Sequence, residues 1–261
     1  MNNPRKYGYP PYIAALVHGG PGAAGDMKPV AERLSKTAGI IEPLQTKQSI
    51  QGLIIELDEL LHRYMQPPFV IAGHSWGAWL SCLYAAEKPS NIKKLILISC
   101  PPFEEKYAVS IQGERVKRLK KNHVEEIDFL MDAFENPAAR NKDKILSRIG
   151  EIMSTADSYD PETGCCKAEV NSAVYRAVWS EAKELRRSGK LIDVIKRIKC
   201  PVTAIHGLYD PHPASGVEMP LKSAIRDFKF TALEKCGHTP WVERQAKEEF
   251  FAVLQGELGI R

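Results

Sequence analysis

Short apolar runs alternate with amphipathic stretches in two parts of the chain, before residue 100 and after residue 199. Six of the runs are candidate strands, at 12–17, 39–41, 69–72, 94–99, 201–206 and 228–233. Between them, the segment 49–65 repeats isoleucine and leucine at the spacing of an amphipathic helix. This alternation predicts an α/β fold with a mostly parallel, six-stranded sheet flanked by helices.

The middle of the chain has few strand-like runs and many charged amphipathic stretches. Helices are predicted there at 115–121, 124–134 and 168–187, with a Pro-, Gly- and polar-rich loop at 157–166. We therefore expect a helical cap inserted into the α/β core. The expected parts are 1–100 (first part of the core), 101–199 (helical cap insertion) and 200–261 (second part of the core).

Two helix starts carry capping signals. Asp26 precedes a segment that presents Met27 and Val30 at helical spacing, so we expect Asp26 to be an N-cap. Thr239 and Pro240 are expected as the N-cap and the first residue of the last helix, because proline is favoured at that position.

The pentapeptide Gly73-His74-Ser75-Trp76-Gly77 fits the pattern G-x-S-x-G. It lies directly between the candidate strand 69–72 and a small, apolar segment that reads as a helix. Glycines at both ends allow a sharp turn, so that the Ser75 hydroxyl projects from a strained strand-to-helix corner. This context predicts that Ser75 is a nucleophile.

A serine hydroxyl needs a base to accept its proton. His238 lies between the last strand and the last helix, at the carboxyl edge of the sheet where Ser75 also lies. Asp210 follows the preceding strand and is expected to orient the base. The chain order nucleophile, acid, base, here Ser75, Asp210 and His238, is the one expected when a serine nucleophile lies at such a strand-to-helix turn of an α/β fold. The alternative for Asp210 is a turn residue before Pro211.

The other histidines receive different interpretations. His18, His74 and His206 are expected to hold loops or strand ends, whereas His62 and His123 lie in charged helical segments and are expected to be solvated. His212 is expected near the site. The loop His18-Gly19-Gly20-Pro21-Gly22 allows a backbone N–H to point at a developing oxyanion, and we expect the N–H groups of Gly20 and Trp76 to form the oxyanion hole.

In these motifs the sequence resembles the α/β-hydrolase superfamily, and within it the proline iminopeptidase group. The superfamily resemblance implies the strand order 4-3-5-6-7-8 in the usual labels, with the first two strands missing and the cap between strands six and seven. In the proline iminopeptidase group the second glycine of the loop and the tryptophan carry the oxyanion hole, which matches Gly20 and Trp76. The chain differs by having His74 where that group has glycine. The resemblance also implies cap carboxylates that hold a substrate amine, and the candidates are Asp157, Asp160, Glu162, Glu169 and Glu181.

Aromatic residues near these positions are candidates for substrate binding. Trp79, Tyr209 and Trp241 lie within a few residues of catalytic positions, and Tyr175 and Trp179 share one face of a cap helix. They predict a pocket for an apolar or ring-bearing acyl group, with core packing as the alternative. The basic stretch 115–121 is interpreted as a solvated helix face, with an anionic substrate as its alternative.

Composition narrows the classes of partner. A net charge of +4 gives no indication of a nucleic-acid partner, and no run approaches the ~20 apolar residues of a membrane span. The N-terminus lacks the apolar core of a signal peptide, so we expect a cytoplasmic protein without a membrane partner.

The six cysteines show no metal-ligand spacing and are expected as free thiols. They are Cys82, Cys100, Cys165, Cys166, Cys200 and Cys236. No metal and no organic cofactor are expected.

The leading interpretation is a serine hydrolase that cleaves a small ester or amide through an acyl-enzyme. Two alternatives stay open, a carbon–carbon bond hydrolase or lyase with the same triad and a catalytically silent binding protein on the same fold. The natural substrate and the oligomeric state do not follow from the sequence.

Overall fold

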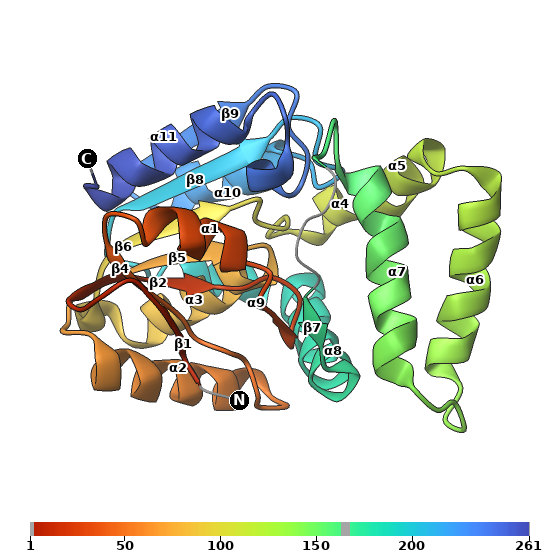
Figure 1. Cartoon of the computed structure of the whole chain (residues 1–261), viewed down its shortest axis with the longest axis horizontal. Coiled ribbons are helices and arrows are strands. Elements are labelled where there is room, and N and C mark those ends of the chain that lie inside the picture. Colours follow the sequence, from red (N-terminus) through yellow and green to blue (C-terminus); the bar gives the residue numbers. More distant parts are fainter. Residues whose placement is uncertain (1–2, 163–167, 261) are drawn as a thin grey trace.

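A seven-stranded sheet runs through the centre of the molecule (Figure 1). The structure is a computed structural model that describes residues 3–162 and 168–260. In sheet order the strands are β1 (Arg5–Tyr7), β4 (Gly39–Glu42), β2 (Tyr12–Val17), β5 (Phe69–His74), β6 (Ile92–Ile98), β8 (Val202–Gly207) and β9 (Phe228–Leu233). The pair β1–β4 is antiparallel and the other neighbouring pairs are parallel, which confirms the mostly parallel sheet.

All six predicted strands are present, and the main sheet contains β1 as a seventh. Strand β1 was not predicted because Arg5-Lys6-Tyr7 has neither an apolar run nor the length of a typical strand. It pairs outside β4 at the sheet edge, so a short strand stands before the one that was expected to come first.

Helices cover both faces of the sheet. One face packs against α1 (Lys28–Leu34) and α11 (Lys247–Leu258), and the other against α2 (Ile50–Tyr64), α3 (Trp76–Glu87), α9 (Lys190–Ile195) and α10 (Ser215–Ala224). A 3₁₀ turn at Pro89–Asn91 leads into β6. This arrangement explains why the central strands are apolar on both faces.

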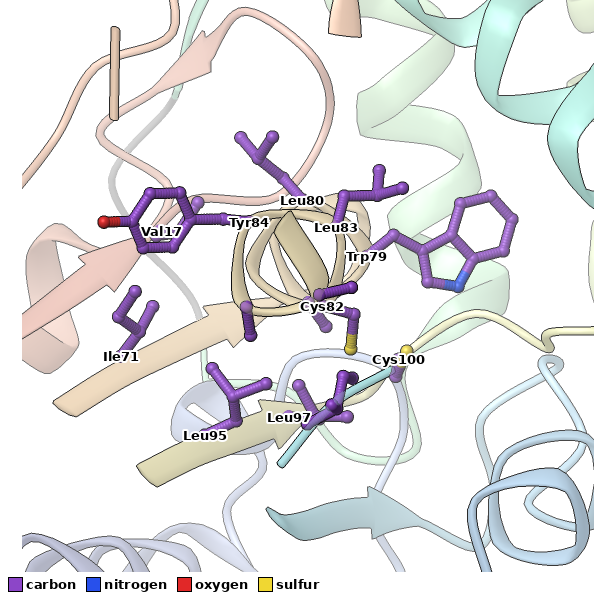
Figure 2. Close-up of a cluster of buried hydrophobic side chains, with 14 of the residues drawn as sticks. Val17, Ile71, Trp79, Leu80, Cys82, Leu83, Tyr84, Leu95, Leu97 and Cys100 are labelled. Carbon is purple, nitrogen blue, oxygen red and sulfur yellow. The ribbon is translucent and has the colours of Figure 1, made fainter. Parts of the chain in front are cut away.

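Helix α3, which follows Ser75, is buried over nearly its whole length. Figure 2 looks along this helix, with Trp79, Cys82 and Tyr84 around it and Leu95 and Leu97 of β6 beneath. A helix that is apolar all round needs partners on every side, and α3 finds them in the sheet and the neighbouring helices. Its first turn is thereby fixed against the sheet.

The described residues between β6 and β8, where the cap 101–199 was predicted, are mostly helical. They contain α4 (Glu105–Ala108), α5 (Ile111–Arg118), α6 (Lys121–Glu135), α7 (Lys142–Asp157), β7 (Glu169–Val170), α8 (Ser172–Arg187) and α9. Helices α6 and α7 lie side by side and project away from the sheet (Figure 1). Helix α8 instead buries Val174, Val178 and Ala182 in the main core. Strand β7 pairs with β3 (Ala23–Ala24), which joins the cap to the loop after β2.

Two predicted helix starts are wrong. Helix α1 begins at Lys28 after Met27, and Asp26 uses its carboxylate elsewhere, as described below. Thr239 and Pro240 begin a 3₁₀ turn (Pro240–Val242) that ends at the extended residue Glu243, and α11 begins only at Lys247. In both places tertiary hydrogen bonds compete with the local capping signal.

No helix in the described residues combines the length and the apolarity that crossing a bilayer requires. Cys82, Cys100, Cys200 and Cys236 are buried free thiols, whereas Cys165 and Cys166 lie outside the described residues.

Candidate active site

Ser75 sits at the corner between β5 and α3. Its φ of 50° is a conformation that non-glycine residues rarely adopt, and it places the hydroxyl at the turn. The flanking glycines are required by close approach: a Cβ on Gly73 would overlap the Gly77 carbonyl oxygen, and one on Gly77 would overlap that of Val17. The elbow therefore depends on both glycines of the motif.

Loops after three parallel strands bring Ser75, Asp210 and His238 together. The Ser75 hydroxyl lies 2.9 Å from Nε2 of His238, and Nδ1 of His238 lies 2.6 Å from an Asp210 carboxylate oxygen. Because an ionised carboxylate only accepts, we assign the proton of the neutral ring to Nδ1, which leaves Nε2 free to accept the serine proton. The three residues predicted from the sequence thus form a continuous hydrogen-bonded chain.

Burial and mutual charge set the ionisation of this chain. Burial alone would raise the pKa of Asp210, but the neighbouring His238 and His212 and their hydrogen bonds hold that pKa well below its usual range. Burial would lower the pKa of His238, but the Asp210 carboxylate outweighs burial and raises that pKa above its ordinary value. Asp210 is therefore anionic, and it favours the imidazolium form of His238.

His212 is a second histidine on the same carboxylate. Its backbone N–H and its Nδ1 donate to the other Asp210 oxygen over 2.9 and 2.7 Å, and its ring packs 4.5 Å from that of His238. Burial lowers the pKa of His212 to about 4, so it is a neutral hydrogen-bond donor near pH 7. His206 in turn donates from Nε2 to the His212 carbonyl, the structural role expected for it.

Asp210, His212 and His238 also form a group whose ligand atoms all lie within 4.8 Å, which is close enough for a metal site. The atoms that face each other are only 2.6 to 2.7 Å apart, which is hydrogen-bond length. An ion between them would need about 2.0–2.2 Å to each ligand and would push them apart. We therefore interpret the group as hydrogen-bonded rather than metal-binding.

Gly20 and Trp76, the predicted oxyanion-hole residues, both line the cavity that contains Ser75. Trp76 is the first residue of α3, where backbone N–H groups have no partner within the helix. Neither backbone N–H donates to any residue in the described part of the chain. Gly20 has a φ of 49°, which fits the sharp turn of this loop.

His74 connects three parts of the site, as its expected loop-holding role requires. Its Nδ1 lies 2.6 Å from Asp26, and its Nε2 donates to the backbone oxygen of His238 over 3.0 Å. Asp26 also accepts from the backbone N–H of Gly19. The elbow, the loop after β2 and the loop of the base are therefore held in one frame.

A cavity of about 320 Å³ opens beside Ser75. The two cap aromatics predicted to bind substrate, Tyr175 and Trp179, line it together with the apolar Leu146, Ile149 and Met153 of α7. A larger cavity of about 800 Å³ between the cap helices adjoins it and shares Leu146, Ile149, Tyr175 and Trp179.

Trp79, Tyr209 and Trp241 do not line this cavity. Trp79 is almost fully buried, donates to the Pro101 carbonyl and stacks behind Trp179. Tyr209 packs beneath the guanidinium of Arg118. Trp241 packs edge-on against His74. All three therefore pack against other side chains outside the cavity, which agrees with the core-packing alternative.

Three charged residues line the cavity wall, namely Asp26, Arg115 and Asp157, and the sequence placed neither Asp26 nor Arg115 at the site. Asp157 was one of five candidate acids in the cap, and the structure places it beside the site. Arg115 was interpreted as solvated but is half-buried and binds Asp157 through two hydrogen bonds. Helix α7 was not predicted as a separate helix, although Ile145, Ile149 and Ile152 recur at helical spacing.

Comparison with known proteins agrees with this architecture. The chain belongs to the Alpha/beta hydrolase family, whose model matches residues 16–253. A proline iminopeptidase from Heyndrickxia coagulans is 23% identical over 92% of this chain and 88% of its own. The monoacylglycerol lipase ABHD6 of Bos taurus is 26% identical over 77% of this chain and 60% of its own length. Among solved structures, the crystal structure of VinJ superposes with a TM-score of 0.70 at 17% identity, covering 98% of this chain and 94% of that one.

Proposed function

We propose that this protein is a serine hydrolase that cleaves a small ester or amide through an acyl-enzyme on Ser75. The observation that carries the proposal is the hydrogen-bonded chain from the Ser75 hydroxyl through His238 to Asp210. The pKa of Asp210 is lowered, so this residue is an anionic carboxylate, and it raises the pKa of His238. A base that is to accept the serine proton needs such a carboxylate behind it.

In the acylation step, Nε2 of His238 accepts the Ser75 proton as the oxygen attacks the substrate carbonyl. The negative charge that develops on the carbonyl oxygen is received by the backbone N–H groups of Gly20 and Trp76. Asp210 stabilises the imidazolium, which then donates its proton to the departing alcohol or amine. In the second step His238 takes a proton from water as the water oxygen attacks the acyl carbon, and the imidazolium then returns that proton to the Ser75 oxygen as the acid leaves.

The cavity favours an acyl group that is apolar and carries no charge. Its wall is formed largely by Tyr175, Trp179 and the apolar side chains of α7. The charged side chains that the described residues contribute to it are already paired, Asp26 with His74 and Asp157 with Arg115. A charged acyl group would lose its hydration without finding a free counter-ion.

The test is turnover of p-nitrophenyl esters of increasing acyl length, compared with the Ser75→Ala variant. We expect hydrolysis by the native chain and no turnover above background in Ser75→Ala, since that variant lacks the nucleophile. Ser188→Ala is the matched control, because its hydroxyl lies at the exposed end of α8. Equal activity in the native chain and Ser75→Ala would refute the proposal.

Aminopeptidase activity is a second candidate, because a proline iminopeptidase is similar to this chain over 92% of its length. The same panel should therefore include aminoacyl arylamides, the prolyl one among them. Arylamide cleavage that is lost in Ser75→Ala would favour this candidate. Asp26 and Asp157 are the carboxylates that the described cavity wall offers to a free amine, and both are engaged in the structure, by His74 and by Arg115.

A further inference from the structure

The end of cap helix α7 is in direct contact with the loop that carries the base. The backbone N–H of His238 donates to the Asp157 carbonyl over 2.7 Å. Gly237 presses against the same carbonyl, since a Cβ at that position would overlap it. The backbone of the proposed base is thus anchored to the cap rather than only to the core.

This anchor brings a carboxylate to the site. The side chain of Asp157 is 10% exposed, and it lines the same cavity as Ser75 and His238. An unpaired carboxylate at this depth would be costly and would act on the charge of a neighbouring imidazole.

Arg115 of α5 neutralises that carboxylate. Its Nε and Nη2 donate to the two oxygens of Asp157 over 2.7 and 2.6 Å, the planar bidentate geometry that arginine forms best. The guanidinium lines the cavity as well. The two opposite charges therefore lie together beside the base, and their effects on it have opposite signs.

Other groups also face His238, and their contacts with it do not pass through this pair. Asp210 and His212 lie on the side of Nδ1, and His74 contacts the backbone oxygen of His238 while bound to Asp26. Arg115 also lowers the pKa of His212, but burial is the larger cause of its pKa of about 4, so His212 stays neutral near pH 7 when Arg115 is replaced. The contribution of the pair can for that reason be measured separately.

We propose that Asp157 and Arg115 are positioning residues for His238: Asp157 anchors the backbone of the base to the cap, and Arg115 neutralises the carboxylate that this anchor brings beside the imidazole. The inference rests on the proposed function for the role of His238 as base. It adds that the cap holds the backbone of the base and balances the charge that it brings beside the imidazole.

The experiment is an NMR titration of the His238 imidazole in Ser75→Ala protein, which requires no substrate. Arg115→Met leaves the Asp157 carboxylate unpaired and should raise the pKa of His238, whereas Asp157→Asn leaves the guanidinium unpaired and should lower it. We expect shifts of about 0.5–1 pH unit in each direction. The double variant should return to within about 0.3 unit of the parent, since both charges are then gone.

Arg148 and Glu126 provide the matched control pair. They form a bidentate ion pair of similar length between α7 and α6, but at the exposed surface. Arg148→Met and Glu126→Gln should leave the His238 titration unchanged. Shifts in the same direction for both single variants at positions 115 and 157, or no shift in either, would overturn the proposal.

Two further results distinguish a variant that does not fold, and a protein that is not a hydrolase, from a failure of this proposal. If Arg115→Met does not fold, the near-isosteric Asp157→Asn decides alone, because the proposal requires a lowered pKa there. In variants that retain Ser75, the acid limb of the pH profile of kcat/KM should move in the same direction as the NMR pKa. If the shifts are opposite but the native chain, with Ser75 intact, shows no turnover on the panel, the positioning pair is supported and the proposed hydrolase is refuted.

Discussion

At the residue scale, the proposed chemistry depends on which nitrogen of His238 carries the proton. Asp210 fixes Nδ1–H by accepting it over 2.6 Å, and this leaves Nε2 facing the Ser75 hydroxyl. His212 occupies the other oxygen of the same carboxylate. Asp210 is thereby held by several donors and has little freedom to turn away from the base.

Asp210→Asn should lower kcat by a factor on the order of 10³–10⁴ with little change in folding. The amide can offer its NH2 group to Nδ1, which favours the tautomer with the proton on Nε2, where it blocks transfer from Ser75. Steady-state kinetics on the best ester of the panel measures the effect. Asp193→Asn, on the exposed side of α9, is the control. A loss smaller than tenfold would show that another group orients His238.

At the element scale, the site depends on how the cap segment after α7 is joined to the loop of the base. Glu243 is fully buried, and its carboxylate accepts the backbone N–H groups of Tyr159 and Asp160 from the cap and of Gly237 from the loop. A single side chain thus satisfies donors from both segments. Because these three backbone N–H groups need the Glu243 carboxylate as acceptor, the 3₁₀ turn ends at Glu243 instead of continuing as a helix.

Glu243→Gln should lower the free energy of unfolding by about 1–3 kcal/mol, because the amide nitrogen would face buried N–H donors that then lack an acceptor. Urea unfolding followed by circular dichroism measures the change. Glu248→Gln is the control, since Glu248 pairs with Arg33 at the surface and its loss should change stability little. Equal midpoints for Glu243→Gln and the native chain would contradict the joining role of Glu243.

At the scale of the whole molecule, six of the seven strands of the main sheet and the three residues of the proposed triad could be predicted from the sequence. Each of Ser75, Asp210 and His238 lies in the turn or loop that follows a strand of the parallel part of the sheet, so their common edge follows from parallel pairing alone. The wall of the cavity could not be predicted in the same way. Amphipathic spacing shows that a cap helix has an apolar face but not which partner covers it.

Arg115 and Asp26 illustrate why local signals failed. A basic residue in a charged helix is usually solvated, but Arg115 meets a carboxylate 42 positions away in the chain. Asp26 precedes a helix, yet His74 and Gly19 compete for its carboxylate more effectively than the helix N-terminus does. Both outcomes depend on contacts between distant segments, which a single sequence does not display.

The buried histidines give the whole molecule a pH dependence of stability. Burial lowers the pKa of His18, of His206 and of His212, the last to about 4. A histidine whose folded pKa is lowered stabilises the fold above its unfolded pKa of about 6.5, and this stability is lost as pH falls toward the folded pKa. His238 acts oppositely: its raised pKa gives a contribution that is complete below about pH 6.5 and is lost as pH rises through the folded value. The pKa values of Asp210 and Asp26 are lowered, so the stability that these residues contribute is lost only below about pH 4.

We therefore expect the free energy of unfolding to fall steadily between about pH 6.5 and pH 4, with His212 alone contributing about 3 kcal/mol over that interval. Urea unfolding at several pH values across this range measures the slope. His212→Gln should reduce the slope, because the side chain no longer takes up a proton on unfolding. His62→Gln, at a partly exposed position on α2, is the matched control. A stability that stays constant or rises as the pH falls to 5 would show that the buried histidines are already protonated in the folded protein.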